Sequence, residues 1–321
     1  MTAKVTITLA FDGASDPVPV RSMRLDRGLA HPVGRATLDL PRGVTAPDPG
    51  AAVSLGVVQG DTSLTLLGGT IAWRGVGLDA TRISILEPAA ALMQTMAAKS
   101  YANTTAGQMI SDLCSIAEVQ TGMILPGATI PHMVLRSDRT MLDHAMRLAH
   151  MSGLALTSDT SGALGALAIN LPIPGAPPAL NRAALVSEDA ENSHIPPANR
   201  MVGAGALGSV GPGASTLPLA DTSLISAGSA DAPATTRVAA IRTLVDATQA
   251  QLAAKQRQAA TISGLCLTTP LPEDLSPGDV VLLPGDNGLP IRMARLETLA
   301  VSFSAQNGLL GHYHFSDLEA A

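Results

Sequence analysis

The chain has 321 residues, which is long enough for two or three domains with ordinary hydrophobic cores. Only 14% of the residues are charged, against about 25% in typical soluble domains, and the net charge is -6. The sequence also has a single Trp, two Tyr and three Phe. Nucleic-acid recognition needs clustered Lys and Arg and aromatic rings for stacking, so this composition argues against it and, for lack of aromatic platforms, against glycan binding.

The low charge leaves two interpretations of the surface. The uncharged surface is either buried in a large assembly or built from small residues such as Ala, Ser, Thr and Gly. Apolar stretches are short and interrupted by Gly, Pro or Thr, far from the ~20 residues that a membrane-spanning helix needs. We therefore expect no membrane insertion.

The N-terminus and the cysteines are typical of a protein made and folded in the cytoplasm. Residues 1–6 enter an alternating strand pattern without the apolar core of a signal peptide. Cys114 lies in a helical pattern and Cys266 in a strand pattern, far apart and without metal-type spacing. Both are expected to be buried free thiols.

Residues 1–95 have the alternation of short β-strands. Apolar residues alternate with Thr or Asp in the first strands, and a Pro-Asp-Pro-Gly turn at 47–50 precedes another strand. Strands are expected at residues 5–9, 36–40, 53–58, 64–67, 70–74 and 82–86, with 64–67 and 70–74 forming a hairpin. Short strands at this spacing indicate a small β-barrel or sandwich.

Residues 96–180 change to helical spacing and predict a compact α+β module. The first helix is expected over 105–119, with a capping box formed by Thr105 and Gln108. The second is expected over 138–151, with Gly153 as its stop and a buried stripe at Leu142, Ala145, Leu148 and Ala149. A hairpin with strands at 154–157 and 164–171 follows, and the proline-rich stretch 172–178 ends the module.

Residues 181–321 return to β patterning with one long helix. The helix is predicted to run to about residue 260, with an apolar stripe at Val238, Ile241, Leu244, Val245 and Leu252. Residues 203–234 are rich in Gly, Ser, Pro and Ala, which predicts a long loop.

A weak internal repeat links the first and last regions. Pro49-Gly50 precedes the strand at 53–58, and Pro277-Gly278 precedes an apolar strand at 280–283. Each turn is followed by further strands and a closing strand, at 82–86 and at 312–315. The repeat predicts two copies of one β-domain around a central α+β insert.

The sequence patterns that could indicate a cofactor or metal site are better explained as loop or surface residues. Residues 203–208 (GAGALG) match the dinucleotide-binding pattern, but the following Ser-Val-Gly-Pro-Gly cannot continue the helix that would hold a pyrophosphate. His144 and His150 lie six apart and do not share a helix face, whereas His312 and His314 share a strand face without an evident third ligand. Solvated or interface histidines are expected. We predict no catalytic residue, no cofactor-binding residue, no cofactor and no metal site.

Three segments carry a resemblance to a known family. The stretch 100–113 (SYANTTAGQMISDL), the helix 137–154 (SDRTMLDHAMRLAHMSGL) and the strand entry 275–281 (LSPGDVV) resemble phage tail baseplate-hub and late-control proteins. The hub portion of type VI secretion spike proteins is also similar. The order of parts covers nearly the whole chain, but the segment 203–234 has no clear counterpart.

The resemblance implies an α+β fold with two tube-type antiparallel β-barrel domains, residues 1–95 and 181–321, flanking a small α+β module at 96–180. It further implies a non-enzymatic homotrimeric hub in a virion tail or injection-particle baseplate. Its partners would be a sixfold tail tube ring and a threefold spike or distal tail protein, with DNA or cargo passing through the lumen without specific binding. Two alternatives stay open: a tail-associated enzyme, such as a peptidase or cell-wall hydrolase, and a tail-tip receptor-binding module.

Overall fold

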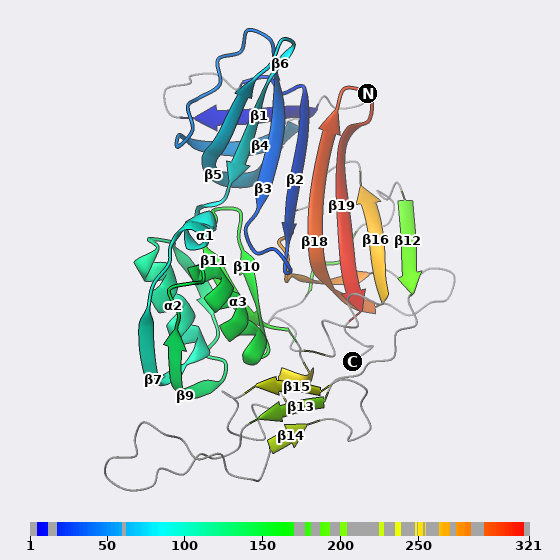
Figure 1. The fold of residues 1–321 in the computed structure, drawn as a ribbon. Coiled ribbons are helices and arrows are strands. Elements are labelled where there is room, and N and C mark those ends of the chain that lie inside the picture. The colour runs from blue at the N-terminus through cyan, green and yellow to red at the C-terminus, as the bar shows by residue number, and fades with distance from the viewer. Residues whose placement is uncertain are drawn as a thin grey trace, which may run out of the picture.

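Antiparallel strands make up most of the fold in the computed structural model of the chain, and the helices are few (Figure 1). The expected α+β class is therefore confirmed. The structure describes residues 5–11, 18–59, 62–169, 177–180, 187–192, 200–203, 225–227, 235–238, 248, 250–252, 254, 263–269, 274–283 and 292–317. None of the helices within these ranges is long and apolar enough to cross a membrane.

The strands of the first β region follow the alternation of the sequence. They are β1 (Val5–Phe11), β2 (Ser22–Gly28), β3 (Arg35–Pro41), β4 (Ala52–Gln59), β5 (Thr62–Val76) and β6 (Ala80–Leu86). In β3 every second side chain, at Ala36, Leu38 and Leu40, is excluded from solvent. This period of two is what a sheet with one buried face requires.

The expected hairpin at 64–67 and 70–74 is wrong, because both segments belong to the single long strand β5. The glycines between them, Gly68 and Gly69, do not form a turn. A Cβ on Gly69 would lie 2.2 Å from the carbonyl oxygen of Leu86 in the neighbouring strand. Glycine at this place allows a close approach of two backbones, which is its other common role inside a strand.

The middle of the chain forms the α+β module. Its elements are η1 (Pro88–Ala90), α1 (Ala91–Gln94), β7 (Lys99–Thr105), α2 (Ala106–Ile116), β8 (Thr121–Ile124), β9 (Thr129–Leu135), α3 (Met141–Met151), β10 (Leu154–Ser158) and β11 (Leu164–Ala168). Strands β10, β11 and β8 form one small sheet, and β7 pairs with β9. The predicted hairpin is the antiparallel pair β10–β11.

Both helices of the module begin at capping boxes. The Thr105 hydroxyl accepts a hydrogen bond from the Gln108 amide at 3.2 Å, and the Gln108 side chain accepts one from the Thr105 amide, as predicted. Thr140 and Asp143 repeat the arrangement at α3, so this helix begins at Met141 rather than at residue 138. The stripe predicted on α3 is confirmed, because Ala145, Leu148 and Ala149 are fully buried and Leu142 is 9% exposed.

The described strands of the last region are β12 (Ser187–Asn192), β13 (Arg200–Gly203), β14 (Ile225–Ala227), β15 (Thr235–Val238), β16 (Ser263–Thr269), β17 (Val280–Leu283), β18 (Arg292–Ser304) and β19 (Gly308–Asp317). Val238 ends strand β15, so it does not open the predicted long helix. Helical residues are described between 248 and 254, where Ala250 is buried and Leu252 is 38% exposed. The predicted loop is wrong at residues 225–227, which form strand β14. The other residues of the predicted helix, and residues 204–224 and 228–234, lie outside the described residues.

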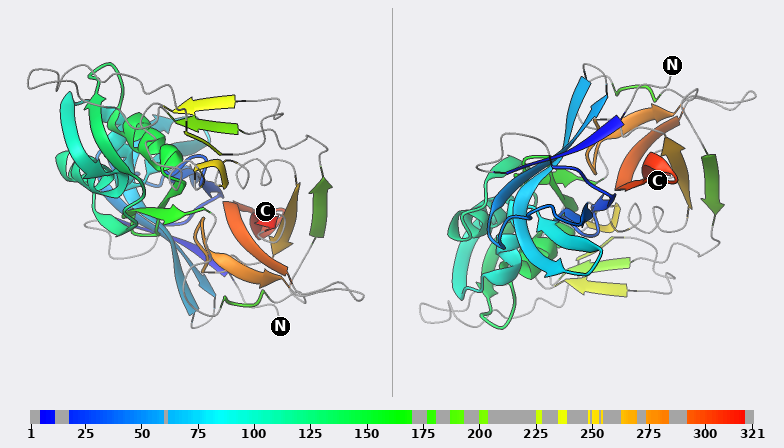
Figure 2. Two further views of the ribbon diagram at one scale, coloured as in Figure 1. Left: turned by 90° about the horizontal axis from the view of Figure 1, so that it is seen from below. Right: turned by 90° about the horizontal axis from the view of Figure 1, so that it is seen from above.

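The first and last β regions share one continuous sheet. Its strand order is β1-β4-β5-β6-β3-β2-β18-β19-β16-β12, with β17 paired to β18. Strands β2 and β18 join the two halves at the middle of this path, and β12 lies at its far end (Figure 1). One hydrophobic core runs through both regions, while the module has a core of its own. In both views of Figure 2 the green module lies beside the first region, away from β12.

The two halves of the sheet have the same internal order. Strands β4-β5-β6-β3-β2 of the first half correspond to β17-β18-β19-β16-β12 of the second, and every one of these pairings is antiparallel. The strands also follow in the same order along the chain. The predicted internal repeat is therefore confirmed as a repeat of topology. No closed barrel is found among the described strands.

The Pro-Gly turns occupy equivalent places in the two halves. The Gly50 amide donates to the carbonyl of Ile71 at 2.8 Å, and the Gly278 amide donates to the carbonyl of Leu296 at 2.8 Å. The glycines have φ angles of 94° and 101°, in the region that favours glycine. Directly after Ile71 and after Leu296 the register with the next strand shifts by a bulge. Turn, strand entry and bulge thus recur together.

Candidate functional site

A strongly buried polar cluster lies where the module meets the first β region. Strand β2 places Met23, Leu25 and Arg27 on its inward face, so the alternation that buries two apolar side chains also buries an arginine. Glu87, the residue directly after β6, is its partner. The side chains of Arg27 and Glu87 are 1% and 0% exposed.

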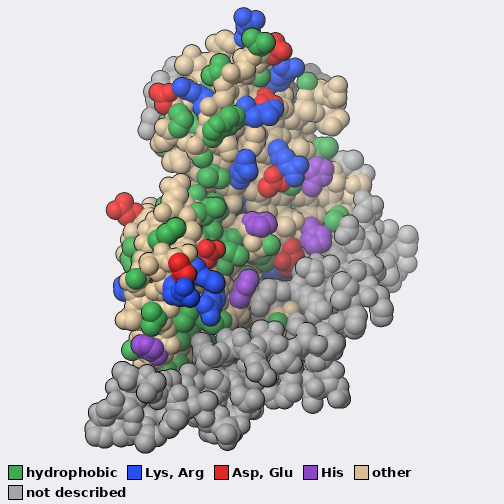
Figure 3. Space-filling model, in the orientation of Figure 1, with side chains coloured by type: hydrophobic (Ala, Val, Ile, Leu, Met, Phe, Trp, Pro, Cys, Tyr) green, Lys and Arg blue, Asp and Glu red, His purple; other side chains and the backbone are tan. Residues whose placement is uncertain are grey.

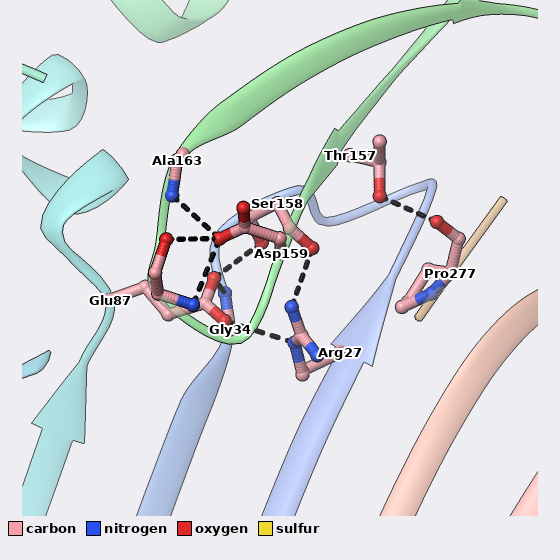
Figure 4. A network of polar contacts seen from close by, with 9 residues as sticks. Arg27, Gly34, Glu87, Thr157, Ser158, Asp159, Ala163 and Pro277 are labelled. Carbon is pink, nitrogen blue, oxygen red and sulfur yellow. Dashed lines mark hydrogen bonds and ion pairs between the residues drawn. The ribbon is translucent and has the colours of Figure 1, made fainter. Parts of the chain in front are cut away.

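The geometry of this cluster engages both carboxylate oxygens of Glu87 (Figure 4). Its Oε1 lies 2.9 Å from Nε of Arg27. Its Oε2 accepts hydrogen bonds from the Gly34 amide at 2.6 Å and from the Ser158 hydroxyl at 2.5 Å. Nη2 of Arg27 donates to the carbonyl of Ser158 at 2.5 Å. These hydrogen bonds satisfy most of the carboxylate, whereas Nη1 of Arg27 has no hydrogen-bond partner among the described residues, so the buried ion pair is only partly compensated.

The same hairpin of the module is also held by the second half of the sheet. The Thr157 hydroxyl donates to the carbonyl of Pro277 at 2.5 Å, at the Pro-Gly turn (Figure 4). Nη2 of Arg295, which is 2% exposed, donates to the carbonyl of Ala168 at 3.3 Å. Each half of the large sheet therefore contributes one buried arginine, whose side chain donates a hydrogen bond to a backbone carbonyl of β10 or β11. We call the contacts of Arg27, Glu87, Thr157, Ser158 and Arg295 the polar joint.

The tip of the hairpin is shaped by a single carboxylate. Oδ1 of Asp159 accepts hydrogen bonds from the amides of Ser161 and Ala163 at 2.9 and 3.0 Å, and from the Ser161 hydroxyl. Such side-chain to backbone contacts favour turns. They fix the hairpin that carries the joint.

A partly buried acid stands at the second Pro-Gly turn. Oδ2 of Asp279 accepts a hydrogen bond from the Ser276 amide at 2.7 Å. Burial raises the pKa of Asp279, while that hydrogen bond and the positive charge of Arg27 act in the opposite direction. The hydrogen bond and the positive charge therefore stabilise the carboxylate of Asp279 by less than burial destabilises it.

The predicted histidine pairs do not assemble into a metal site. No group of three potential metal ligands occurs within the described ranges. His312 is exposed and its two ring nitrogens lie 3.1 and 3.2 Å from the hydroxyls of Thr268 and Ser302. His144 and His150 fall on different faces of α3, as predicted.

The expectation of a solvated or interface histidine is wrong for His144. This residue is 3% exposed and its Nε2 lies 2.9 Å from the carbonyl of Arg136. His150 is exposed. His144 thus contacts the segment that precedes α3.

The remaining sequence candidates are only partly described. Gly203 ends strand β13, which pairs with β14 and β15, and the rest of the 203–208 motif lies outside the described residues. Neither Cys114 nor Cys266 forms a disulfide; Cys114 is buried and Cys266 is half-buried. Burial raises the pKa of the Cys114 thiol to about 11, so it is protonated and unreactive at neutral pH.

Sequence reasoning did not find Arg27 and Glu87. A signal for Arg27 was present, because it continues the Met23 and Leu25 alternation onto the inward face of β2. An arginine at such a position needs a buried partner. Nothing local identified Glu87 as that partner, since the contact depends on how β2 and β6 are placed in the sheet.

The surface gives no sign of a single charged patch on the face drawn in Figure 3, where positive and negative side chains lie close to one another.

The comparisons with known proteins match the chain in fold only. No protein family and no curated protein matches the sequence. Solved structures match it in fold. The 43 kDa tail protein of prophage MuSo2 from Shewanella oneidensis is 15% identical, with a TM-score of 0.71, over 99% of this chain and 99% of that chain.

Two further structures extend this likeness. The tail protein from Neisseria meningitidis MC58 is 14% identical with a TM-score of 0.67, covering 97% of this chain and 96% of that one. A component of the type VI secretion system from E. coli, described as similar to the T4 bacteriophage tail proteins gp27 and gp5, is 11% identical with a TM-score of 0.62, covering 96% and 76%. These likenesses confirm, at the level of the fold, the resemblance to phage tail proteins found in the sequence.

Proposed function

We propose that this chain, whose fold is that of phage tail proteins, is the structural hub of a phage-like tail or contractile injection baseplate and works as a homotrimer. The observation that carries the proposal is the repeat of one five-strand order within a single sheet. Three copies of a chain with two such halves present six equivalent β units. A ring of this kind adapts a sixfold tail tube to a threefold spike or tail tip.

The polar joint supports a geometric role. An adaptor must hold its two halves at a fixed angle, because any error is repeated around the ring. The halves are linked directly through β2 and β18, and the module contacts both through one buried and two partly buried hydrogen bonds, made by Arg27, Thr157 and Arg295. Buried polar groups that are held by several hydrogen bonds favour a single arrangement.

Each of the three sequence regions would have its own role in the ring. Residues 1–95 and 181–321 would supply the tube-type barrel domains that line the channel, and residues 96–180 the module beside them. One side of the ring would dock a tail tube ring, and the other a spike or distal tail protein. The chain would be made in the bacterial cytoplasm and incorporated into the particle. The net charge of -6 would let DNA or cargo slide through without binding, since phosphate is repelled.

The function would be non-enzymatic. Glu87, the most buried carboxylate of the cluster, has both oxygens engaged by Arg27, Gly34 and Ser158, which suits a structural contact better than acid–base chemistry. A purified-protein assay on cell-wall material checks this part of the proposal. Hydrolysis that persists in a tightly purified sample would make the tail-associated enzyme the better reading.

Cryo-electron microscopy of the assembled particle tests the hub itself. We expect three copies of the chain around the tail axis, between a sixfold tube ring and a threefold component. A single copy, a sixfold ring of this chain or a position away from the axis would overturn the proposal.

A further inference from the structure

Strand β5 has the same pairing pattern as β18 up to one difference. In both strands the first part pairs with a neighbour from the Pro-Gly turn, β4 for β5 and β17 for β18. After the bulge, Thr298–Ser304 of β18 pairs along the same edge with β2. In β5, that edge of the corresponding stretch from Trp73 to Val76 pairs with no described strand.

At one equivalent position the exposure of the side chain differs between the two halves. Val76 lies opposite Thr81 and Val301 lies opposite Gly311, at the same step after the bulge in each half. Val301 is 0% exposed, whereas Val76 is 78% exposed. Trp73, the single tryptophan of the chain, is 52% exposed on the same stretch, in which the Arg74 side chain contacts Ala46, Pro47 and Asp48. A β-strand edge with exposed large apolar side chains is a template for another strand.

The fold also contains the strand that fits this edge. In the first half, β2 is the last strand in the order β4-β5-β6-β3-β2, and it pairs with the edge of β18. Its counterpart in the second half is β12, which ends the large sheet and pairs with β16 only, among the described strands. Counting only the described residues, each chain therefore has one end strand and one strand edge that pair with no further strand, at corresponding places of the two halves.

We propose that β12 of a second copy of this chain pairs antiparallel with the 73–76 stretch of β5, as β2 pairs with β18 within the chain. The register follows from the repeat. Leu25 of β2 pairs with Val301 of β18. Ala190 of β12 is the counterpart of Leu25: Leu25 pairs with Ala36 and Ala190 pairs with Leu265, and these two partners occupy equivalent positions of β3 and β16. Val76 therefore lies opposite Ala190 of the second copy.

The contact is head-to-tail, so each copy donates at one end and accepts at the other. Interfaces of this type close into rings when the rotation between copies allows it. Here every sheet junction in the ring would repeat the β2–β18 junction that the chain already contains. This inference rests on the proposed trimer, to which it assigns the strands and the register of the interface.

Disulfide trapping tests the register. Directly opposite residues of an antiparallel pair have Cα atoms about 4.5–5.5 Å apart, within the range of a disulfide. The full chain with Val76→Cys and Ala190→Cys should, on mild oxidation, give a covalent species that stops at three copies. A mixture of the two single variants should give only cross-linked dimers, which shows that the bond joins different copies. The matched control, Val76→Cys with Ser187→Cys, is three residues out of register and should stay uncross-linked.

The outcomes separate this inference from the trimer. If light scattering shows a trimer but the Val76–Ala190 pair stays reduced, or the out-of-register pair cross-links instead, the strand pairing is wrong and the trimer stands. If the chain is monomeric and uncross-linked at every concentration and in the particle, both are wrong.

A charge on the open edge provides a second test. Val76→Asp should weaken association about tenfold or more, because the carboxylate would be covered by the incoming strand. The monomer should unfold at the same temperature as the parent, since Val76 is exposed there. Val134→Asp makes the same change at a site 58% exposed on β9 of the module and should leave association unchanged. Equal effects of the two variants would overturn the pairing.

Discussion

Nε of Arg27 and Oε1 of Glu87 lie 2.9 Å apart with both side chains removed from solvent, although Arg27 lies in β2, Glu87 follows β6 and both contact Ser158 of β10. The pair is the centre of the polar joint. Its energetic role depends on which partner is removed, because an ion left alone in the interior loses both its solvation and its counter-charge.

Removing Arg27 should therefore destabilise the fold strongly. We expect Arg27→Met to lower the free energy of unfolding by ~3–5 kcal/mol. Adding Glu87→Leu should not add a second loss of that size, because the double variant no longer buries an unpaired charge. Urea denaturation of the two variants measures both values. The matched control is Arg24→Met in the exposed pair with Asp26, which should change stability by less than ~1 kcal/mol; a similar effect at both arginines would contradict the role of the joint.

Local features of the sequence predicted local features of the fold. The capping box at Thr105 and the apolar stripe of α3 were both found, because they depend on residues within a few positions of one another. The Pro-Gly turns were found for the same reason. Their equivalence in the two halves was also predictable, since the turn and the closing strand recur at similar spacing.

Features that depend on distant strands were not found. Gly68-Gly69 looks like a turn in the sequence, and only the approach of Leu86 explains why the strand continues through it. The junction of β2 with β18 brings together segments from opposite ends of the chain. Arg27 indicated a buried charge, but Glu87 and Ser158 could be recognised as its partners only in the folded chain.

The buried stripe of α3 gives a prediction about packing. Leu148→Ala should lower the free energy of unfolding by ~2–5 kcal/mol, because Leu148 is fully buried in the core of the module. His150→Ala on the exposed face is the matched control and should have little effect. Thermal unfolding separates the two, and a destabilising His150→Ala with a neutral Leu148→Ala would reverse the assignment of the helix faces.

His144 should behave differently from His150. Its ring is buried and contacts the carbonyl of Arg136, so His144→Ala opens a cavity and leaves that carbonyl without its side-chain partner. We expect a loss of ~1–3 kcal/mol in the free energy of unfolding, measured by urea denaturation. Particle assembly should fall only in proportion to this loss. Abolished assembly in a stably folded variant would instead indicate a direct functional role.

The two Pro-Gly turns should respond alike to the loss of glycine. Gly50→Ala and Gly278→Ala each place a side chain on a backbone with positive φ, which costs about 1–2 kcal/mol. No atom lies within 4 Å of the Cβ position at Gly50, so its effect isolates the backbone term. Gly122→Ala is the control, because its nearest contact is an ordinary 3.9 Å and alanine suits a strand better than glycine. Stability of both turn variants equal to that of the parent would remove the conformational reason for the repeated glycine.

The pKa of Asp279, raised by burial, predicts a specific pH dependence of stability. Below the ordinary value of 3.8 the acid is protonated in the folded and unfolded chain, and its contribution is fully present. As the pH rises through the raised folded pKa, the folded protein must bury a charge that the unfolded chain exposes, and this contribution is lost. Asp279→Asn should therefore gain stability relative to the parent between acid and neutral pH. Asp39→Asn should show the opposite trend, because the hydrogen bond from Arg82 lowers the pKa of Asp39 and its contribution is lost as the pH falls. Urea midpoints measured across this range check both signs, and parallel curves for the two variants would contradict the assignment of Asp279.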